Sequence, residues 1–152
     1  TSALENPIFI SDLVKYFGSQ AIVVSIDVKK NIFGNYIVKS VGGRRSTRWA
    51  PLDWAIEVEK YGAGEILLTA IDREGSWQGF DVNLVKSITS SVNIPVIAHG
   101  GAGCLNDISE VVYHANASAV ALGSLVVYQK KGMGVLVNFP SQGELKVLFG
   151  DT

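Results

Sequence analysis

Short apolar segments alternate with amphipathic segments along most of the 152-residue chain. The apolar segments are of strand length and are bounded by glycine, proline or charged residues, which is typical of strands. Because hydrophobic residues occupy successive positions in them, the pattern predicts strands covered on both faces, as in a parallel sheet. The four predicted strands are Ala21–Ile26, Ile66–Thr69, Ile94–Ile97 and Ala117–Leu122.

The amphipathic segments begin at residues that favour helix termini. Pro7 and Pro51 each open such a segment, and proline suits the first helical turn because its missing N–H would have no intrahelical partner there. Asp81 is placed to cap a third helix, and a fourth helix contains Ile108 and His114. Strands and helices therefore alternate, which predicts βαβ units.

One connection departs from this alternation. Tyr36–Ser40 and Arg44–Arg48 lie on either side of a Gly-Gly pair, and two short runs around such a pair predict a β-hairpin. The tail from Gln129 is less regular, and Val135–Phe139 fits either a final strand or part of a closing helix.

The predicted fold class is α/β, of the (β/α)₈ TIM-barrel type. Four strand–helix units without a Gly-x-Gly-x-x-Gly after the first strand favour half of a barrel over a dinucleotide-binding fold. A complete barrel needs about 250 residues, and this chain begins with Thr1 rather than methionine. We therefore expect residues 1–152 to be the C-terminal half of a barrel, strands 5 to 8, with the N-terminal half missing.

The amino-acid composition argues against some classes of function. Thirteen basic and 14 acidic side chains give a formal net charge of −1, so a nucleic-acid partner is not expected. No apolar run approaches the roughly 20 residues of a membrane helix. The single cysteine, Cys104, fits a cytoplasmic protein and is expected to be a small buried residue. The basic cluster Arg44, Arg45 and Arg48 is either a solvated loop or a phosphate-steering group.

Candidate chemistry belongs at the carboxyl ends of the strands, where barrels place their active sites. Asp27 ends the first strand and is either a general acid/base or a loop cap. Glu74, beside Arg73, is either a second carboxylate or half of a surface ion pair. His99 ends the third strand and points into the predicted mouth, whereas His114 lies on a helix. Neither histidine has partners for a zinc site, so no metal or cofactor is expected.

Glycines follow both the third and the fourth predicted strand. Glycine lets backbone N–H groups approach an anion closely, and a following helix N-terminus favours negative charge. Phosphate sites in these barrels use the loops after strands 7 and 8, which are the loops concerned here if the four strands are strands 5 to 8. The alternative is a pair of tight turns without a ligand. The predicted phosphate-binding residues are Gly100, Gly101, Gly123 and Ser124.

Four segments of the chain form a specific combination: Ser25-Ile-Asp-Val-Lys29, Gly62-Ala-Gly-Glu-Ile-Leu-Leu-Thr69, Ile71-Asp-Arg-Glu-Gly75 and Ala98-His-Gly-Gly-Ala-Gly103. Together they resemble the HisF family, the cyclase subunit of imidazole glycerol phosphate synthase. The resemblance covers the chain from Thr1 to about Val127.

The resemblance implies a lyase of histidine biosynthesis with a small phosphorylated substrate. It would use ammonia from a HisH-type glutaminase subunit to convert a phosphoribulosyl aminoimidazole carboxamide nucleotide to imidazole glycerol phosphate. A second catalytic aspartate would lie on strand 1, outside this chain, so the chain alone is expected to be inactive. The implied roles are catalysis for Asp27, phosphate binding for Glu74, Gly75, Gly101 and Ser124, lining of the site for Thr69, and the ammonia entrance for Glu65.

The chain departs from the family pattern in three places. Glu74 stands in place of an aspartate, His99 stands in place of a small residue and would crowd the phosphate mouth, and the end from Gly123 looks more like a paralogous branch. That branch is associated with ammonia delivery for amidation of nucleotide sugars in surface polysaccharide synthesis, which is one alternative function. A non-catalytic phosphate-binding half-barrel is another. A half-barrel leaves sheet edges and an apolar interior uncovered, so self-association is expected.

Overall fold

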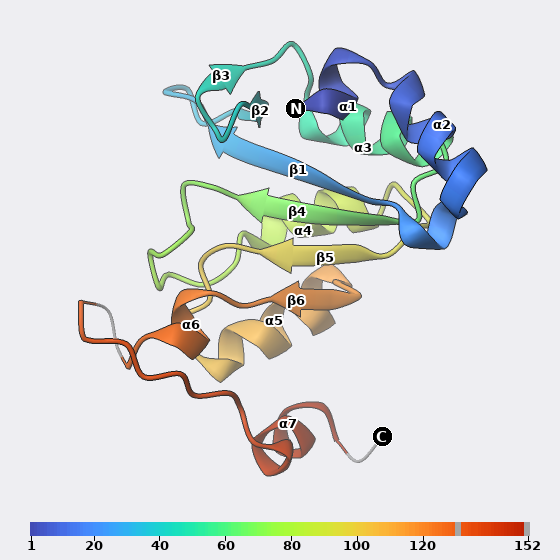
Figure 1. Ribbon diagram of the computed structural model, residues 1–152. Coiled ribbons are helices and arrows are strands. Elements are labelled where there is room, and N and C mark those ends of the chain that lie inside the picture. The colour runs from blue at the N-terminus through green and yellow to red at the C-terminus, as the bar shows by residue number, and fades with distance from the viewer. Residues whose placement is uncertain (130–131, 151–152) are drawn as a thin grey trace.

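A computed structural model describes residues 1–129 and 132–150 of the chain. Its framework is one six-stranded sheet in the order β3-β2-β1-β4-β5-β6. Strands β1, β4, β5 and β6 are mutually parallel, and their carboxyl ends lie along one edge (Figure 1). The strands are β1 (Val23–Lys30), β2 (Tyr36–Ser40), β3 (Arg45–Ser46), β4 (Glu65–Ala70), β5 (Val96–His99) and β6 (Ala119–Ala121).

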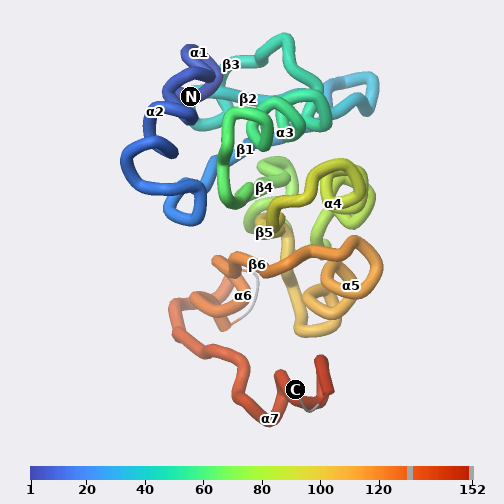
Figure 2. The backbone as a smooth tube through the Cα atoms, turned by 90° about the vertical axis from the view of Figure 1, so that its right-hand side faces the viewer, coloured from blue at the N-terminus to red at the C-terminus, as the bar shows by residue number. Residues whose placement is uncertain are grey.

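The crossover helices between the parallel strands lie on one side of the sheet (Figure 2). This is the arrangement expected from successive βαβ units. The helices are α1 (Ser2–Glu5), α2 (Ile8–Phe17), α3 (Pro51–Lys60), α4 (Val82–Thr89), α5 (Leu105–Ala115), α6 (Ser124–Val127) and α7 (Gln142–Phe149), with a 3₁₀ turn at Ser19–Ala21. The predicted α/β alternation is therefore confirmed.

The hydrophobic core lies between the sheet and these helices. Alternate residues of β1, namely Val24, Ile26 and Val28, are buried there, and Trp54 of α3 is almost completely enclosed in the same cluster. Full burial of a large apolar side chain stabilises the fold by about 1.5–3 kcal/mol. Side chains on the helix-facing side of the sheet therefore form the packed core between the sheet and the helices.

The opposite face of the sheet has no helical layer in the described part of the chain. The side chain of Val23 is 50% exposed there, and Ser25 and Ala119 are also exposed. The prediction that the first strand is covered on both faces is therefore wrong for this chain, because its burial alternates from residue to residue. This uncovered surface, which we call the open face, corresponds to the interior of a closed barrel.

The first strand starts later and extends further than the sequence predicted. Residues 19–21 form a 3₁₀ turn, and β1 continues to Lys30 because Asp27–Lys30 pair with β2. The predicted hairpin is confirmed as β2 and β3, which pair antiparallel. Asp27 consequently lies within the strand rather than after it.

Other boundaries shift by a few residues. Strand β5 extends to His99, and β6 is limited to three residues. The segment Val135–Phe139, left open between strand and helix, contains neither: Val135 makes an isolated bridge with Tyr128, and α7 begins only at Gln142.

Cys104 is exposed, so the prediction that it is buried is wrong. It is the residue before α5 and has an extended backbone. The buried face of α5 consists of Ile108, Val111 and Ala115, and Cys104 lies before the first helical turn and outside this face.

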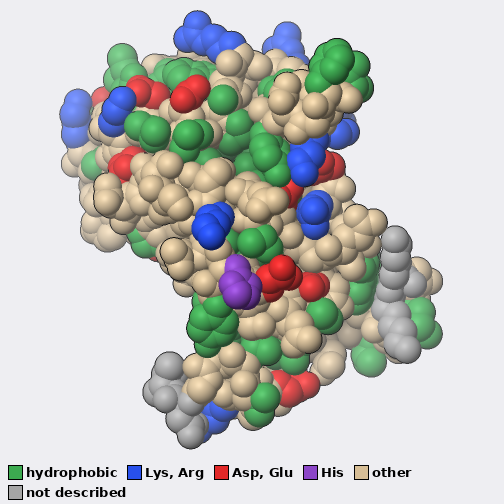
Figure 3. Space-filling view, turned by 180° about the vertical axis from the view of Figure 1, so that it is seen from behind, with side chains coloured by type: hydrophobic (Ala, Val, Ile, Leu, Met, Phe, Trp, Pro, Cys, Tyr) green, Lys and Arg blue, Asp and Glu red, His purple; other side chains and the backbone are tan. Residues whose placement is uncertain are grey.

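None of the described helices is long and apolar enough to cross a membrane. Seen from behind, the surface carries basic and acidic side chains interspersed with hydrophobic ones (Figure 3). This face therefore shows no large area of a single charge sign, in keeping with the balanced composition.

Candidate functional site

A row of residues crosses the open face near the carboxyl ends of the strands. Asp27 of β1 is the register partner of Thr69 of β4. Thr69 is also the register partner of His99 of β5, and His99 is that of Ala121 of β6. Register partners in a sheet point to the same face, and neighbouring strands are about 4.8 Å apart. The structure therefore brings the predicted catalytic Asp27 and the predicted lining residue Thr69 next to each other.

His99 and Thr69 are in direct contact within this row. The Oγ1 atom of Thr69 lies 3.3 Å from Nδ1 of His99, and Thr69 is only 6% exposed. A buried hydroxyl that bonds one ring nitrogen fixes the orientation of the imidazole. His99 is thus held at the edge of the open face rather than left free in the mouth.

Next to this row is a cavity of about 220 Å³. It is formed by the loops after three successive parallel strands, β4, β5 and β6, by α6, and by Tyr128 directly after α6. Its lining is Glu74, Gly75, His99, Gly100, Gly101, Ala102, Ala121, Gly123, Ser124, Val127 and Tyr128. Six of the seven residues expected to bind substrate or phosphate line it. The seventh, Thr69, does not line the cavity but contacts His99. The predicted catalytic residue Asp27 does not line the cavity either.

Glycine is required at two of these positions by contact with neighbouring backbone. Gly100 and Gly101 have φ values of 97° and 110°, in the region that disfavours L side chains. A Cβ at Gly100 would lie 2.6 Å from the carbonyl oxygen of Ala70, and a Cβ at Gly101 would overlap that of Gly79. The loop after β5 can therefore pack against the loop after β4 only without side chains.

The loops after β4 and β6 also approach each other. A Cβ built at Gly75 would lie 3.8 Å from Oγ of Ser124. Within the described residues, the backbone amides of Gly75, Gly101 and Ser124 donate no hydrogen bond to the protein. Free amides around a small cavity are suitable donors to an anion.

The start of α5 is capped by a carboxylate of its own first turn. The carboxylate of Asp107 accepts hydrogen bonds from the amides of Gly103 and Cys104, at 2.7 Å and 3.0 Å. These bonds belong to the capping box at the start of α5. The cavity lining in the described residues ends at Ala102 in this loop, so the contribution of the α5 N-terminus to phosphate binding stays a prediction.

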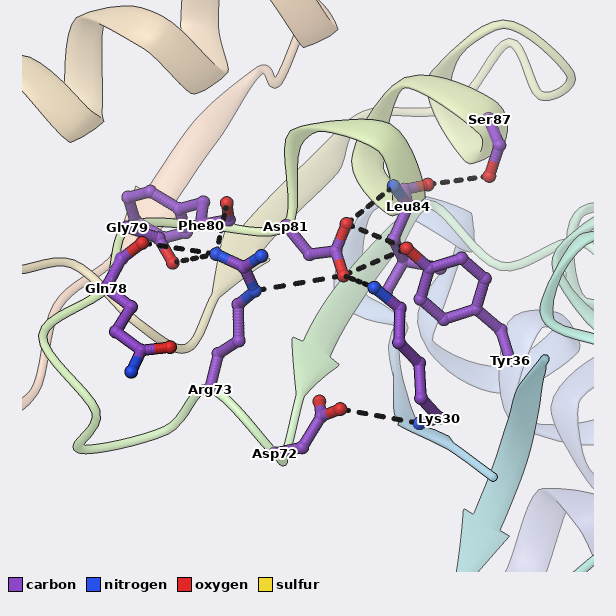
Figure 4. A network of polar contacts seen from close by, with 10 residues as sticks. All are labelled: Lys30, Tyr36, Asp72, Arg73, Gln78, Gly79, Phe80, Asp81, Leu84 and Ser87. Carbon is purple, nitrogen blue, oxygen red and sulfur yellow. Dashed lines mark hydrogen bonds and ion pairs between the residues drawn. The ribbon is translucent and has the colours of Figure 1, made fainter. Parts of the chain in front are cut away.

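A network of polar contacts surrounds the buried side chain of Asp81 (Figure 4). The hydroxyl of Tyr36 donates to the carboxylate of Asp81 at 2.9 Å, and Nζ of Lys30 lies 3.3 Å from Oδ2 of Asp81. The Leu84 amide also donates to Asp81, so Asp81 caps α4 as predicted. The network joins the hairpin, β1 and the start of α4.

The protonation of this network follows from its contacts. Burial alone would raise the pKa of Asp81, but hydrogen bonds from the Leu84 amide, Tyr36 and Lys30 together lower it below its usual value. The pKa of Lys30 is raised, first by its interaction with Tyr36 and then by Asp81. Burial is the main cause of the raised pKa of Tyr36. Each group therefore keeps its ordinary charge at neutral pH.

Arg73 connects this network to the glycine loops. Its Nε lies 3.8 Å from Oδ2 of Asp81, and the same guanidinium donates to the carbonyls of Gln78, Gly79 and Phe80. The Gly79 amide in turn donates to the carbonyl of Gly101 at 2.8 Å. Arg73 thus pairs with Asp81 rather than with Glu74, and Glu74 is left at the cavity.

The remaining predicted residues lie apart from the cavity. Glu65 is the first residue of β4, at the opposite end of the strand from Thr69. Arg44, Arg45 and Arg48 are exposed, and Arg48 lies over the ring of Trp49. In the described ranges, no three His, Cys, Asp or Glu side chains come together in a group able to hold a metal ion.

Comparison with known proteins shows which family the chain belongs to. Over residues 1–132 the sequence matches the family described as "Histidine biosynthesis protein". The chain belongs to this family. The family match confirms the resemblance that the sequence motifs predicted and the half-barrel, α/β character of the sheet.

Curated members of this family include close relatives named "Imidazole glycerol phosphate synthase subunit HisF". The protein from Alkaliphilus metalliredigens (strain QYMF) is 45% identical over 130 residues, which are 86% of this chain and 52% of that protein. The protein from Prochlorococcus marinus (strain AS9601) is 42% identical over 149 residues, 97% of this chain and 58% of that protein. The chain therefore spans about half the length of the curated relatives it matches.

Proposed function

We propose that this chain is the C-terminal half of a HisF-type barrel, the cyclase subunit of imidazole glycerol phosphate synthase. The observation that carries the proposal is the cavity formed by the glycine loops after β4, β5 and β6, on the same edge of the sheet as Asp27. The family membership and the names of the relatives support it.

In this proposal the cavity holds one phosphate of the substrate. The free amides of Gly75, Gly101 and Ser124 donate to its oxygens, and Gly100 and Gly123 allow the backbone to come close. Thr69 positions His99 at the rim. Glu74 contributes through its place in the loop, since its exposed side chain carries the same charge sign as the ligand.

Asp27 is the proposed general acid/base of the cyclisation. Its carboxylate faces the side of the sheet on which the substrate would lie when its phosphate occupies the cavity. A carboxylate in this position can accept a proton from a reacting amine and return it to a leaving oxygen. The second carboxylate of the reaction would come from the other half of the barrel.

The ammonia is proposed to come from a HisH-type glutaminase at the opposite end of the barrel. Glu65 stands at the amino end of β4, where a charged residue can mark the entrance to the interior. We further propose a cytoplasmic enzyme that needs no cofactor, and we expect the 152-residue chain alone to be inactive.

The test is formation of imidazole glycerol phosphate from the phosphoribulosyl precursor and ammonium salts. The chain would be co-produced with the part of the Alkaliphilus metalliredigens relative that it does not match, to complete the barrel. We expect turnover by this pair, and loss of turnover with retained phosphate binding for Asp27→Asn. Turnover of a nucleotide sugar but not of the histidine precursor would favour the amidation alternative, and phosphate binding without any turnover would favour a non-catalytic half-barrel.

A further inference from the structure

The glycine-lined cavity has an unusual charge composition for an anion site. Among the described residues, its lining contains no lysine or arginine, and the one residue with a permanent charge is the acidic Glu74. The nearest arginine, Arg73, is engaged with Asp81 and with three backbone carbonyls. Of the lining residues in the described part of the chain, His99 is therefore the only one whose side chain can exist as a cation.

The position of His99 suits contact with a ligand. Its Nδ1 is held by the buried Thr69 hydroxyl at 3.3 Å. Within the described residues, Nε2 makes no hydrogen bond. The ring is thus fixed at one nitrogen and has the other available at the cavity.

The groups around His99 come from each neighbouring element. On β4 the neighbour is Thr69, which does not titrate, and on β6 it is Ala121. Asp27 lies one strand further along the same row. Glu74 and Tyr128 line the cavity with His99. Asp27 and Glu74 are therefore the carboxylates, and Tyr128 the phenol, among the groups near His99 in the described part of the chain.

We propose that His99 is an anion-binding residue that makes phosphate binding at this cavity depend on pH. The proposal rests on the phosphate-binding cavity of the proposed function. When the imidazole takes a proton from solvent, both ring nitrogens become donors: Nδ1–H donates to Thr69, and Nε2–H donates to a phosphate oxygen. Binding is then tight at mildly acidic pH and weak once the proton is lost.

Inorganic sulfate is the discriminating probe, because it remains a dianion across this range and phosphate does not. Sulfate and phosphate would be titrated into the 152-residue chain by calorimetry at pH 5.5 and pH 8. We expect sulfate to bind about tenfold more tightly at pH 5.5, as a charge-assisted hydrogen bond replaces a neutral one. In His99→Gln, which keeps a neutral donor, this difference should disappear.

The chain contains only two histidines, so His114 provides the matched control. It is exposed on α5, and His114→Gln should bind sulfate as the wild type does. Nuclear magnetic resonance of the unmodified chain avoids any folding defect of the variants: added sulfate should raise the titration midpoint of His99 and leave that of His114 unchanged.

The outcomes separate the two proposals. Sulfate binding of equal strength at both pH values, or a pH dependence retained in His99→Gln, would overturn the role of His99 and leave the phosphate cavity standing. Absence of sulfate and phosphate binding at either pH would overturn both the cavity assignment and the role of His99.

Discussion

Tyr36 and Asp81 are 45 residues apart in the sequence, yet the Tyr36 hydroxyl lies 2.9 Å from each carboxylate oxygen of Asp81. The contact joins the hairpin that follows β1 to the first turn of α4. Because Arg73 also reaches Asp81, and the loop it braces donates to Gly101, the network supports the wall of the glycine-lined cavity.

Removing the Tyr36 hydroxyl should destabilise the protein. Hydrogen bonds to charged groups contribute roughly 1.5–3 kcal/mol, so Tyr36→Phe is expected to lower the free energy of unfolding by about 2 kcal/mol, measured by urea denaturation. Tyr16, which is 84% exposed, offers the control Tyr16→Phe, for which no change is expected. Equal unfolding midpoints for the two variants would contradict the importance of the contact.

Acid should weaken the fold through Asp81. Its pKa is lowered in the folded state, so its stabilising contribution is fully present above the unfolded value of about 3.9. The contribution is lost as pH falls through the folded pKa. Between pH 6 and pH 2 the free energy of unfolding should therefore fall more steeply for the wild type than for Asp81→Asn. Asp12→Asn, at an exposed helix position, should follow the wild-type curve.

The close approach of the two loops at Gly101 gives a sharper structural prediction. In Gly101→Ala the new Cβ would overlap the carbonyl oxygen of Gly79 at a φ that alanine disfavours. The loops must separate, with a cost of about 2 kcal/mol or more and loss of anion binding. The control is Gly134→Ala, since nothing lies within 4 Å of a Cβ there. Unchanged stability and anion affinity in Gly101→Ala would show that the cavity does not depend on this packing.

The sequence predicted the parallel strands, the hairpin and the cap at Asp81 because these depend on local patterns. Prolines, a glycine pair and short β-branched runs are signals that act over a few residues. The clustering of Gly75, Gly101 and Ser124 was also predictable, since the carboxyl ends of parallel strands share one edge.

Other features depend on contacts that no local pattern encodes. The extension of β1 to Lys30 results from pairing with β2, and the roles of Tyr36 and Arg73 arise only when three distant segments meet at Asp81. Cys104 was expected to be buried on the basis of residue type alone, whereas its position at the start of α5 leaves it exposed. The contact of His99 with Thr69 likewise follows from strand register.

The open face should make the isolated chain self-associate. It presents apolar side chains, including the half-exposed Val23, that a closed barrel would cover. Sedimentation at micromolar concentration is expected to show dimers or larger species, and Val23→Lys should shift the distribution toward monomer. Ile32→Lys changes another apolar residue, 93% exposed, in the turn between β1 and β2, and should leave the distribution unchanged. A monomeric wild type would remove the basis for this prediction.

The glycine loops after β4, β5 and β6 are proposed to form one phosphate site. Amide chemical shifts of the ¹⁵N-labelled chain, followed during addition of inorganic phosphate, test it most directly. Saturable changes are expected at Gly75, Gly101 and Ser124. None is expected at Tyr113 and Leu145, which line a separate apolar hollow between α5 and α7. Changes confined to other parts of the chain, or none at the three loop amides at saturating phosphate, would contradict it.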